Sequence, residues 1–169
     1  MKIHYFLLFP LCALVINCGY HLSGHGQFLP ADAKTIIITD FKNNTSRFQV
    51  EQFVTLAVKE EFIRRTRLRL VDSASRADLV IEGQVDAFDV RPLSYSDRAA
   101  ANLYEVQIVV SVRLMNIKTN ELLFEGSRQN FRDSYQTDTG DFFSQETEAL
   151  KKIADRFGAS IVSSILENY

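Results

Sequence analysis

Two stretches of the chain repeat apolar residues at the spacing of an α-helix. Between residues 47 and 65 the repeating positions are Val50, Phe53, Val54, Ala57, Val58 and Phe62. Ser46 followed three residues later by Gln49 is the pattern of a capping box at a helix N-terminus. After Ser144, a residue type common at N-caps, the repeating positions are Leu150, Ile153, Ala154, Phe157, Ile161, Ile165 and Leu166. Both segments are therefore predicted to be amphipathic helices.

Four other segments have the patterns of β-strands. Residues 35–39, TIIIT, are a short β-branched run, typical of a strand buried on both faces. Residues 78–90 alternate, and the side chains expected on the buried side are Leu79, Ile81, Val85 and Ala87. Gly83 in this segment predicts a bulge or a close approach of another backbone. After a predicted loop at 91–102, residues 103–132 alternate around the turn NIKTNE and predict an antiparallel hairpin. Residues 67–73 form either a short strand or the exit of the first helix.

The order of these elements, β-α-β-β-β-α, favours an α+β fold. Two helices packed on one face of a four-stranded mixed sheet would bury every apolar stripe. The hairpin then has one buried side and one polar side, and the polar side carries Glu105, Gln107, Ser111 and Arg113. We expect a single domain at residues 34–169, because a chain of about 150 residues can form one core.

The first 17 residues have the pattern of an export signal. Lys2 is followed by an uncharged apolar run at residues 6–16, which is shorter than the roughly 20 residues that a membrane-spanning helix needs. No A-x-A cleavage triplet ends the run, and the sequence there reads Val15-Ile16-Asn17-Cys18. These residues resemble the lipobox of bacterial lipoproteins. In such a box the cysteine thiol is alkylated by diacylglycerol, and the cysteine becomes the first residue of the mature chain.

The cysteine content agrees with lipid attachment at Cys18. The chain has two cysteines, and Cys12 lies in the predicted signal peptide, residues 1–17, so the mature chain cannot form an internal disulfide. Residues 18–33, rich in Gly, His and Ser, are then an acylated tether. Gly19, where an aspartate commonly retains lipoproteins in the inner membrane, favours the outer membrane. The alternative is a core cysteine in a buried N-terminal element.

Residue types suited to catalysis are scarce in the predicted mature chain. Its two histidines, His21 and His25, lie in the tether, so neither a metal site on a helix nor a Ser-His-Asp triad is expected. Asp86 and Asp89 are three residues apart on a predicted strand and are expected to point to opposite faces. Without Lys2 the chain has 18 basic and 21 acidic residues, a formal charge of −3, which gives no reason to expect a nucleic-acid partner. We expect no enzyme, no cofactor and no metal.

Basic residues are densest in RRTRLR, residues 64–69. At the C-terminus of the first helix they can complement the helix dipole in water. They can also bind an anionic partner, such as a phosphorylated lipid head group. Arg91 and Arg98 in the predicted loop, and Lys118 at the tip of the hairpin, are weaker candidates of the same kind.

Several blocks together resemble one known family. They are CGYHLSG at the acylation site, LP before the first strand, FKNNTSRFQVEQFVTLAVKEEF, RLRLVDSASRADLVIEG, and YEVQIVVSVRLMNIKTNELLFEG. This resemblance is to the lipopolysaccharide-assembly lipoproteins (LptE). It implies a non-catalytic protein anchored by acyl chains, palmitate among them, in the inner leaflet of the outer membrane and facing the periplasm. It also implies a plug inside the β-barrel LptD that supports barrel assembly and lipopolysaccharide transport.

Lipopolysaccharide binding through basic loop residues is a further implication of the resemblance. Arg98 is the nearest match to one basic position of the family, with Arg91 and Lys118 as further candidates. The segment DSYQTDTGDFF has no lysine or arginine where the family can place another. Two other classes remain open: a pilotin-like or secretion-system assembly lipoprotein, and a periplasmic ligand-binding module with a small pocket.

Overall fold

The protein is described by a computed structural model that covers residues 29–95, 101–136 and 142–167. One mixed sheet has the order β3-β1-β4-β5-β6, with β2 paired to β4. The strands are β1 Thr35–Ile38, β2 Lys42–Asn43, β3 Arg69–Leu70, β4 Leu79–Tyr95, β5 Ala101–Asn116 and β6 Glu121–Gln136. The helices are α2 Val50–Arg65 and α3 Phe142–Glu167, and a 3-10 turn spans Ala74–Arg76.

The predicted α+β fold with two helices is confirmed, but the sheet has six strands rather than four. The two strands that the pattern did not separate, β2 and β3, are two residues long each. Such short strands leave no alternation to detect. They form because β1 and β4 present unpaired edges, to which β3 and β2 add in parallel register.

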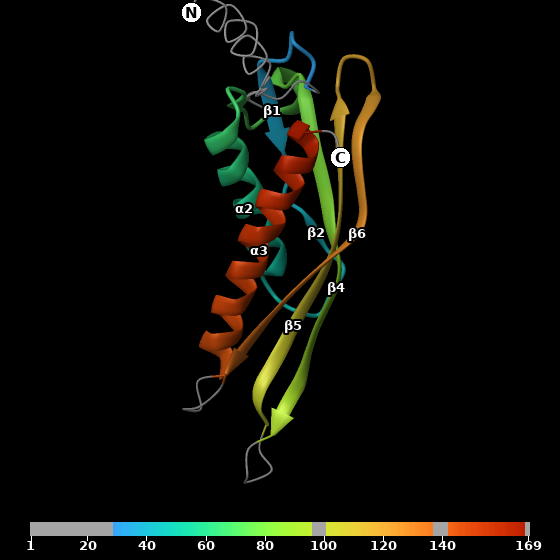
Figure 1. Cartoon of the computed structure of the whole chain (residues 1–169). Helices are drawn as coiled ribbons and strands as arrows, with labels where there is room; N and C mark the ends of the chain where they lie inside the picture. Colours follow the sequence, from blue (N-terminus) through green and yellow to red (C-terminus); the bar gives the residue numbers. More distant parts are fainter. Residues whose placement is uncertain (1–28, 96–100, 137–141, 168–169) are drawn as a thin grey trace, which may run out of the picture.

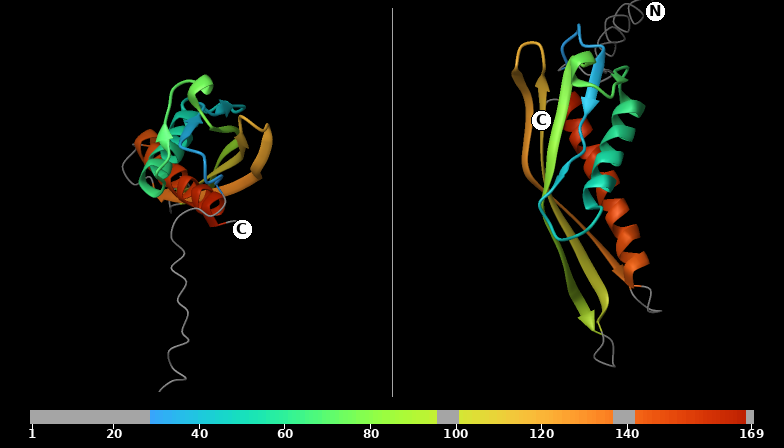
Figure 2. Two further views of the ribbon diagram at one scale, coloured as in Figure 1. Left: turned by 90° about the horizontal axis from the view of Figure 1, so that it is seen from above. Right: turned by 180° about the vertical axis from the view of Figure 1, so that it is seen from behind.

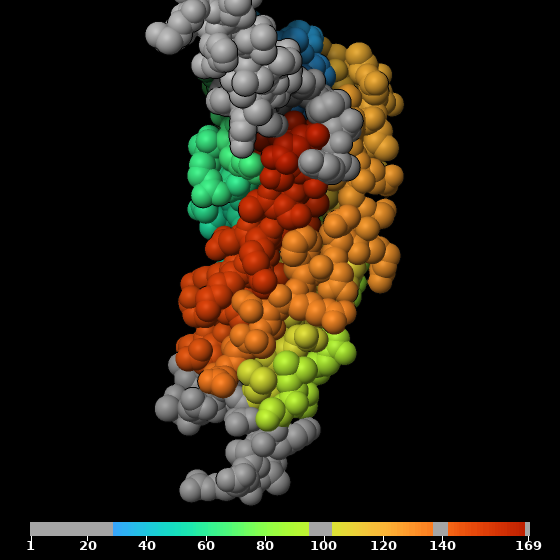
Figure 3. Space-filling model, in the orientation of Figure 1, coloured from blue at the N-terminus to red at the C-terminus, as the bar shows by residue number. Residues whose placement is uncertain are grey.

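Both helices cover the same side of the sheet (Figures 1 and 2). They lie side by side, and β6 follows the other flank of α3 (Figure 3). The largest fully buried side chains between the layers include Phe62, Leu79, Ile81, Ile108, Leu114, Leu150, Ile153 and Phe157. Each side chain of this size contributes about 1.5–3 kcal/mol when it leaves water. In the described ranges no helix covers the other side of the sheet.

The predicted hairpin and the apolar face of the last helix are confirmed. β5 and β6 pair antiparallel around a turn at residues 117–120. The alternating residues of β5 are buried, namely Val106, Ile108, Val110, Val112 and Leu114. Helix α3 begins at Phe142, two residues before the expected N-cap Ser144, and its predicted positions at Leu150, Ile153, Ala154, Phe157, Ile161 and Ile165 are buried.

Helix α2 begins at Val50, later than predicted and without the capping box. Gln49 is the N-cap residue, has φ 67° and makes no side-chain cap hydrogen bond. Asn43 closes the preceding loop instead. Its Nδ2 donates to the Arg47 carbonyl at 2.9 Å and to Glu51 Oε2 at 2.8 Å. These hydrogen bonds fasten the loop to the first turn of α2, but Asn43 Nδ2 is a donor and does not cap the free N–H groups of the helix.

Strand β4 contains a β-bulge at Asp86. Val85 and Ala87 take consecutive places in the ladder with β5, and Asp86 is the extra residue between them. The alternation therefore shifts by one position, and Phe88 rather than Ala87 continues the buried side. The prediction that Ala87 shares a side with Val85 is wrong, because a strict period of two cannot anticipate an inserted residue.

The same bulge places Asp86 and Asp89 on one face of the sheet, contrary to the prediction of opposite faces. Asp86 accepts a hydrogen bond from Ser111, and Asp89 lies opposite Gln107 in the ladder. Ser111 and Gln107 both belong to the polar side of β5. The two carboxylates are nevertheless held by different neighbours and form no shared site.

Strands β4 and β5 continue into the segment predicted to be a loop. β4 ends at Tyr95 and β5 begins at Ala101, so the ladder includes Arg91 opposite Glu105. Beyond β2 the outer edge of β4 has no neighbouring strand in the described part of the chain. Pro92 is tolerated there because an edge strand does not need its backbone N–H on that side.

Gly83 lies against the ring of Phe41 in the core. A Cβ at this position would overlap three atoms of that ring. Phe41 packs edge-on against Phe157 of α3, with the ring centroids 6.2 Å apart. The close approach predicted at Gly83 therefore exists, but an aromatic side chain makes it rather than a backbone.

Candidate functional site

The open side of the sheet carries polar side chains from β4 and β5. Each lies between residues whose side chains enter the core, as strand alternation requires. The facing pairs in the ladder are Glu82 with Arg113, Gln84 with Ser111, Asp89 with Gln107, and Arg91 with Glu105. The predicted polar side of the hairpin is therefore confirmed. Its ion pairs join neighbouring strands, as in Arg113 with Glu82 and Arg91 with Glu105, and Arg91 also lies 3.7 Å from Asp89 on its own strand.

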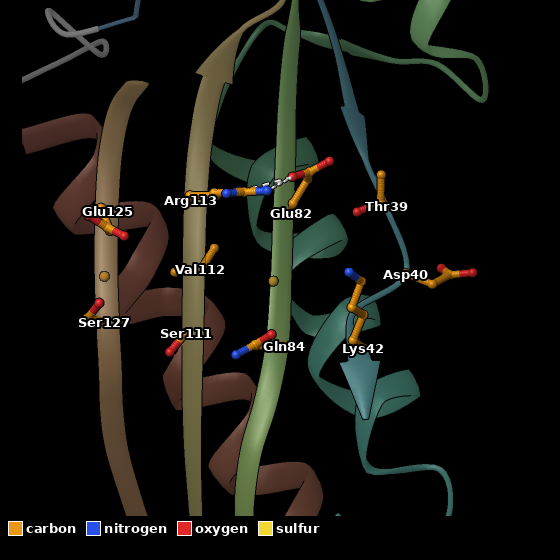
Figure 4. A pocket seen from close by; sticks show the side chains of 12 residues that line it. Thr39, Asp40, Lys42, Glu82, Gln84, Ser111, Val112, Arg113, Glu125 and Ser127 are labelled. Carbon is orange, nitrogen blue, oxygen red and sulfur yellow. Dashed lines mark hydrogen bonds and ion pairs between the residues drawn. The ribbon is translucent and has the colours of Figure 1, made fainter. Parts of the chain in front are cut away.

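Arg113 is the central cation of this side (Figure 4). Its Nε and Nη2 donate to the same oxygen of Glu82, at 3.0 and 2.7 Å. Glu125 of β6 lies opposite Arg113 on its other flank. The side chains of Arg113 and Glu82 are 57% and 42% exposed, so the pair contributes about 0–1 kcal/mol to folding. Such a pair can be exchanged for charges on a partner at little cost to the fold.

Asp86 is the centre of a hydrogen-bond network beside this ion pair. Ser111 Oγ donates to one of its carboxylate oxygens, and Gln84 Nε2 donates to the other at 2.6 Å. Ser111 Oγ also accepts from the backbone N–H of Arg128 at 3.0 Å. Arg128 lies in a bulge of β6 with φ 48°. The β4 bulge at Asp86 and the β6 bulge at Arg128 therefore lie on the two sides of β5, and the Ser111 hydroxyl hydrogen-bonds to both.

A shallow groove of about 570 Å³ runs over these residues. Its lining comes from β2, β4, β5, β6 and the segment after β1, and Figure 4 shows the side chains directed towards the viewer with the helices behind. The residues that line it are Thr39, Asp40, Lys42, Glu82, Gly83, Gln84, Ser111, Val112, Arg113, Glu125, Gly126 and Ser127. The groove offers hydrogen-bond donors and acceptors of both charges over an extended surface, which suits a docking face better than an enclosed ligand site.

The described residues offer no set suited to acid–base catalysis through histidine or thiol chemistry. Residues 29–95, 101–136 and 142–167 contain neither histidine nor cysteine. Within the same ranges no group of three acidic, histidine or cysteine side chains could hold a metal ion. The open side offers ion pairs and hydrogen bonds, as at Arg113 and Asp86.

The structure places the predicted basic residues in separate parts of the molecule. Arg91 contacts Glu105 at 3.2 Å and donates to Gln107 at 2.6 Å. Lys118, in the turn after β5, is roughly 35 Å further along that strand. One ligand head group cannot contact both. Arg98 and the predicted acylation site, Cys18, lie outside the described residues, as does most of the predicted tether.

Lys118 is engaged within the fold. Its Nζ lies 2.6 Å from a carboxylate oxygen of Asp78. Asp78 also accepts from the Lys34 and Thr35 backbone N–H groups, at 2.9 and 3.0 Å. The hydrogen bond from Lys118, followed by the one from the Lys34 N–H, holds the pKa of Asp78 well below its usual range. The same contact raises the pKa of Lys118.

A second ion pair, which the sequence did not reveal, lies at the other end of the helical layer. Arg47 Nε is 2.6 Å from Glu146 Oε1, and Glu146 is only 5% exposed. The Arg47 guanidinium lies 5.9 Å from the centroid of the Phe88 ring. Burial, and next the negative charge of Glu146, raise the pKa of the neighbouring Tyr135 hydroxyl. No period or motif connects positions 47 and 146, so only the packed structure shows the pair.

A family model matches most of the chain. Residues 33–165 match the model described as LptE, lipopolysaccharide-assembly. The chain belongs to the LptE family. The match covers β1 to α3, so the predicted resemblance is confirmed over the whole described domain. No curated protein sequence is similar enough to this LptE-family chain to match it.

Solved structures share the fold of this LptE-family chain at low sequence identity. A Caulobacter crescentus protein assigned as a lipoprotein has a TM-score of 0.55 and 14% identity, over 76% of this chain and 88% of its own. PelC from Paraburkholderia phytofirmans, a dodecamer, has a TM-score of 0.53 and 13% identity, over 83% and 92%. Lipoprotein B from Nitrosomonas europaea has a TM-score of 0.52 and 14% identity, over 81% and 89%. At these identities the likeness shows the fold alone.

Among the described residues, neither α2 nor α3 combines the length and the apolar character that crossing a bilayer needs. Both helices are instead explained by the core that they cover.

Proposed function

We propose that the chain is an outer-membrane lipoprotein, acylated at Cys18, that docks as a plug in an LptD-type β-barrel. In this role it supports assembly of the barrel and delivery of lipopolysaccharide to the outer leaflet. Membership of the LptE family supports the assignment. The observation that carries it is the open, polar side of β4, β5 and β6, which no helix covers in the described ranges.

The physical argument concerns the surface that such a plug must meet. The lumen of a large barrel is polar and lined by hydrogen-bonding side chains. The open side matches that requirement, because Glu82 and Arg113 form an accessible ion pair and Asp86 presents a carboxylate held by hydrogen bonds. The opposite side is closed by α2 and α3, so docking needs no opening of the core. The mechanism is stoichiometric binding rather than turnover.

Affinity purification through a C-terminal tag tests this function. We expect a barrel of LptD size to be recovered in a roughly one-to-one ratio with the tagged chain. Recovery of a secretin would support the secretion-system alternative instead. Recovery without any barrel, together with unchanged surface lipopolysaccharide after depletion, would contradict the proposed role.

A charge reversal on the open side locates the docking face. Arg113→Glu would place three carboxylates together, with Glu82 and Glu125 as neighbours, so recovery of the barrel should fall at least fivefold. Lys151→Glu is the matched control, because it makes the same charge change at an exposed position of α3. Equal recovery with both variants would exclude the open side as the contact.

Direct capture of lipopolysaccharide by Arg98 is a separate proposal, and it rests on the family resemblance. Arg98→Glu should weaken capture of lipopolysaccharide by the purified protein without changing its thermal unfolding, since a charge reversal repels phosphate groups. Arg91→Gln is a useful comparison, because Arg91 is already paired with Glu105. Unchanged capture by Arg98→Glu would make Arg98 an ordinary surface residue.

A further inference from the structure

One end of the molecule gathers segments that are far apart in the sequence. The start of β1, the C-terminal ends of α2 and α3, and the turn between β5 and β6 lie together there (Figures 1 and 2). A groove of about 350 Å³ opens at this end. Its apolar lining includes Leu29 and Pro30 at the start of the described chain, Leu68, and Leu166 of α3. The side chains of Lys34, Arg65 and Arg67 complete its rim.

The arginines of RRTRLR divide into two groups at this end. Arg64 and Arg65 belong to the last turn of α2 and both contact the carboxylate of Glu61. Arg65 also lies 3.6 Å from Glu167 of α3. Helix-end electrostatics and these carboxylates account for both side chains. Complementing the helix dipole, the first of the two roles considered for the basic run at residues 64–69, therefore explains Arg64 and Arg65.

Arg67 and Arg69 lie beyond the end of α2, where the chain is extended. Leu68 and Leu70 between and after them pack against the core, so alternation directs both arginines outwards. The backbone is fixed, because the Arg69 N–H donates to the Lys34 carbonyl at 2.9 Å. The helix dipole acts only within the last turn and does not explain cations placed here.

Neither arginine is neutralised within the fold. Among the residues that the structure describes, no carboxylate forms an ion pair with Arg67 or Arg69. Both are exposed, and exposed Lys34 adds a third cation beside them. Arg67 lies at the rim of the apolar groove, and Arg69 lies two residues further along the chain, on a neighbouring surface that also includes Asp40 and Asp72. Exposed arginines close to apolar side chains have the chemistry of a membrane interface, where cations meet phosphate groups and apolar atoms meet the acyl boundary.

The length of chain between Cys18 and Leu29 limits how far the folded domain can lie from the membrane that holds an acylated Cys18. Ten residues, 19–28, separate Cys18 from Leu29 in the sequence. Even a fully extended chain of this length spans only about 35 Å. If Cys18 carries the acyl chains, as proposed above, this end of the fold stays close to the leaflet that holds them.

We propose that Arg67 and Arg69 bind anionic phospholipid head groups of the leaflet that holds the acyl anchor. The contact fixes the orientation of the domain on the membrane. The tether end, which is the end of the fold where the described chain begins at Leu29, then lies against the bilayer. The contact rests on the proposed acylation of Cys18 but is separate from docking to the barrel, which uses the open side of the sheet.

Arginine footprinting on lipid nanodiscs tests the contact. The full acylated chain is placed on discs of phosphatidylcholine alone or with one third phosphatidylglycerol, treated with phenylglyoxal, and analysed by mass spectrometry. Modification of Arg67 and of Arg69 should each be about fivefold slower on the anionic discs, the factor expected for one arginine at an anionic surface. Exposed Arg132 on β6 is the internal control and should react equally on both.

Each alternative has its own outcome. Equal rates at Arg67 and Arg69 on the two kinds of disc would overturn the proposal. So would equal protection by inorganic phosphate in solution, which would indicate a phosphate site instead of a surface contact. Protection by lipopolysaccharide but not by phosphatidylglycerol would assign the arginines to a different lipid. A chain that leaves neutral discs during size-exclusion chromatography has no working anchor, and that result would contradict the proposed function itself.

Discussion

Asp78 joins three parts of the chain through one side chain. Its carboxylate accepts from the Thr35 hydroxyl at 2.8 Å and from the start of β1, and it pairs with Lys118 in the turn after β5. Lys118 therefore has a structural role, beside its proposed role in lipid binding. The sequence alone could not separate the two, because residues 35, 78 and 118 become neighbours only when β1, β4 and β5 pair.

Asp78 predicts a specific dependence of stability on pH. Its pKa is lower in the folded chain than in the unfolded chain, so its contribution is complete above the unfolded value of about 3.9 and is lost as the pH falls below it. Asp78→Asn should lower stability at pH 7 and should flatten the loss of stability below pH 4. Urea unfolding between pH 3 and 7 measures both effects.

Asp72→Asn provides the control for that series. Asp72 pairs with Arg76 at an exposed site, so its replacement should leave the pH profile of the natural chain nearly unchanged. A profile of Asp78→Asn that follows the natural chain below pH 4 would contradict the argument.

Among the elements, α3 is held to α2 and to the loop before it by specific contacts as well as by the core. The Arg47–Glu146 pair connects the loop before α2 to the first turns of α3. Gly158 permits close contact of the helices, because a Cβ there would lie 2.8 Å from the Ala57 carbonyl oxygen. Helical spacing predicted both apolar faces, but it could not predict which turns meet.

The buried ion pair should be costly to break from one side. Arg47→Met would leave Glu146 buried without its cation and should destabilise the fold by about 3 kcal/mol, the low end for buried pairs, since Arg47 is 26% exposed. Arg47→Met with Glu146→Leu should recover most of the loss. Lys151→Met, which breaks an exposed pair on α3, should cost below about 0.5 kcal/mol. Urea unfolding at pH 7 checks the series, and equal costs for the two single variants would contradict it.

At the scale of the whole molecule, three surfaces have different chemistry. The side covered by α2 and α3 holds the core, and the open side presents paired charges. The end where the described chain begins carries Arg67 and Arg69, which form no ion pair with the residues that the structure describes. The barrel-recovery experiment with Arg113→Glu belongs to the second surface, and the footprinting experiment to the third. Because Arg113 and Arg67 lie on different surfaces, Arg113→Glu should reduce recovery of the barrel and leave the footprint of Arg67 on anionic discs unchanged.

The alternation of β4 shows the limit of sequence reasoning on this fold. Leu79, Ile81 and Val85 were predicted correctly, since a strand with one buried side has a period of two. The extra residue at Asp86 moved Ala87 to the other side, and no local signal marks such an insertion. Pro92 likewise favoured a loop at a position where an edge strand continues.

The amino-acid pattern was enough to predict the class of fold, the buried faces of the hairpin and of α3, and the resemblance to the LptE family. These follow from periodicity and from local sequence blocks, which are short-range properties of the chain. Only the tertiary structure decided the short strands β2 and β3, the neighbours of Asp78 and Glu146, and the separation of Arg91 from Lys118. These depend on which residues meet after the chain closes on itself, because burial and pairing are properties of contacts between distant segments.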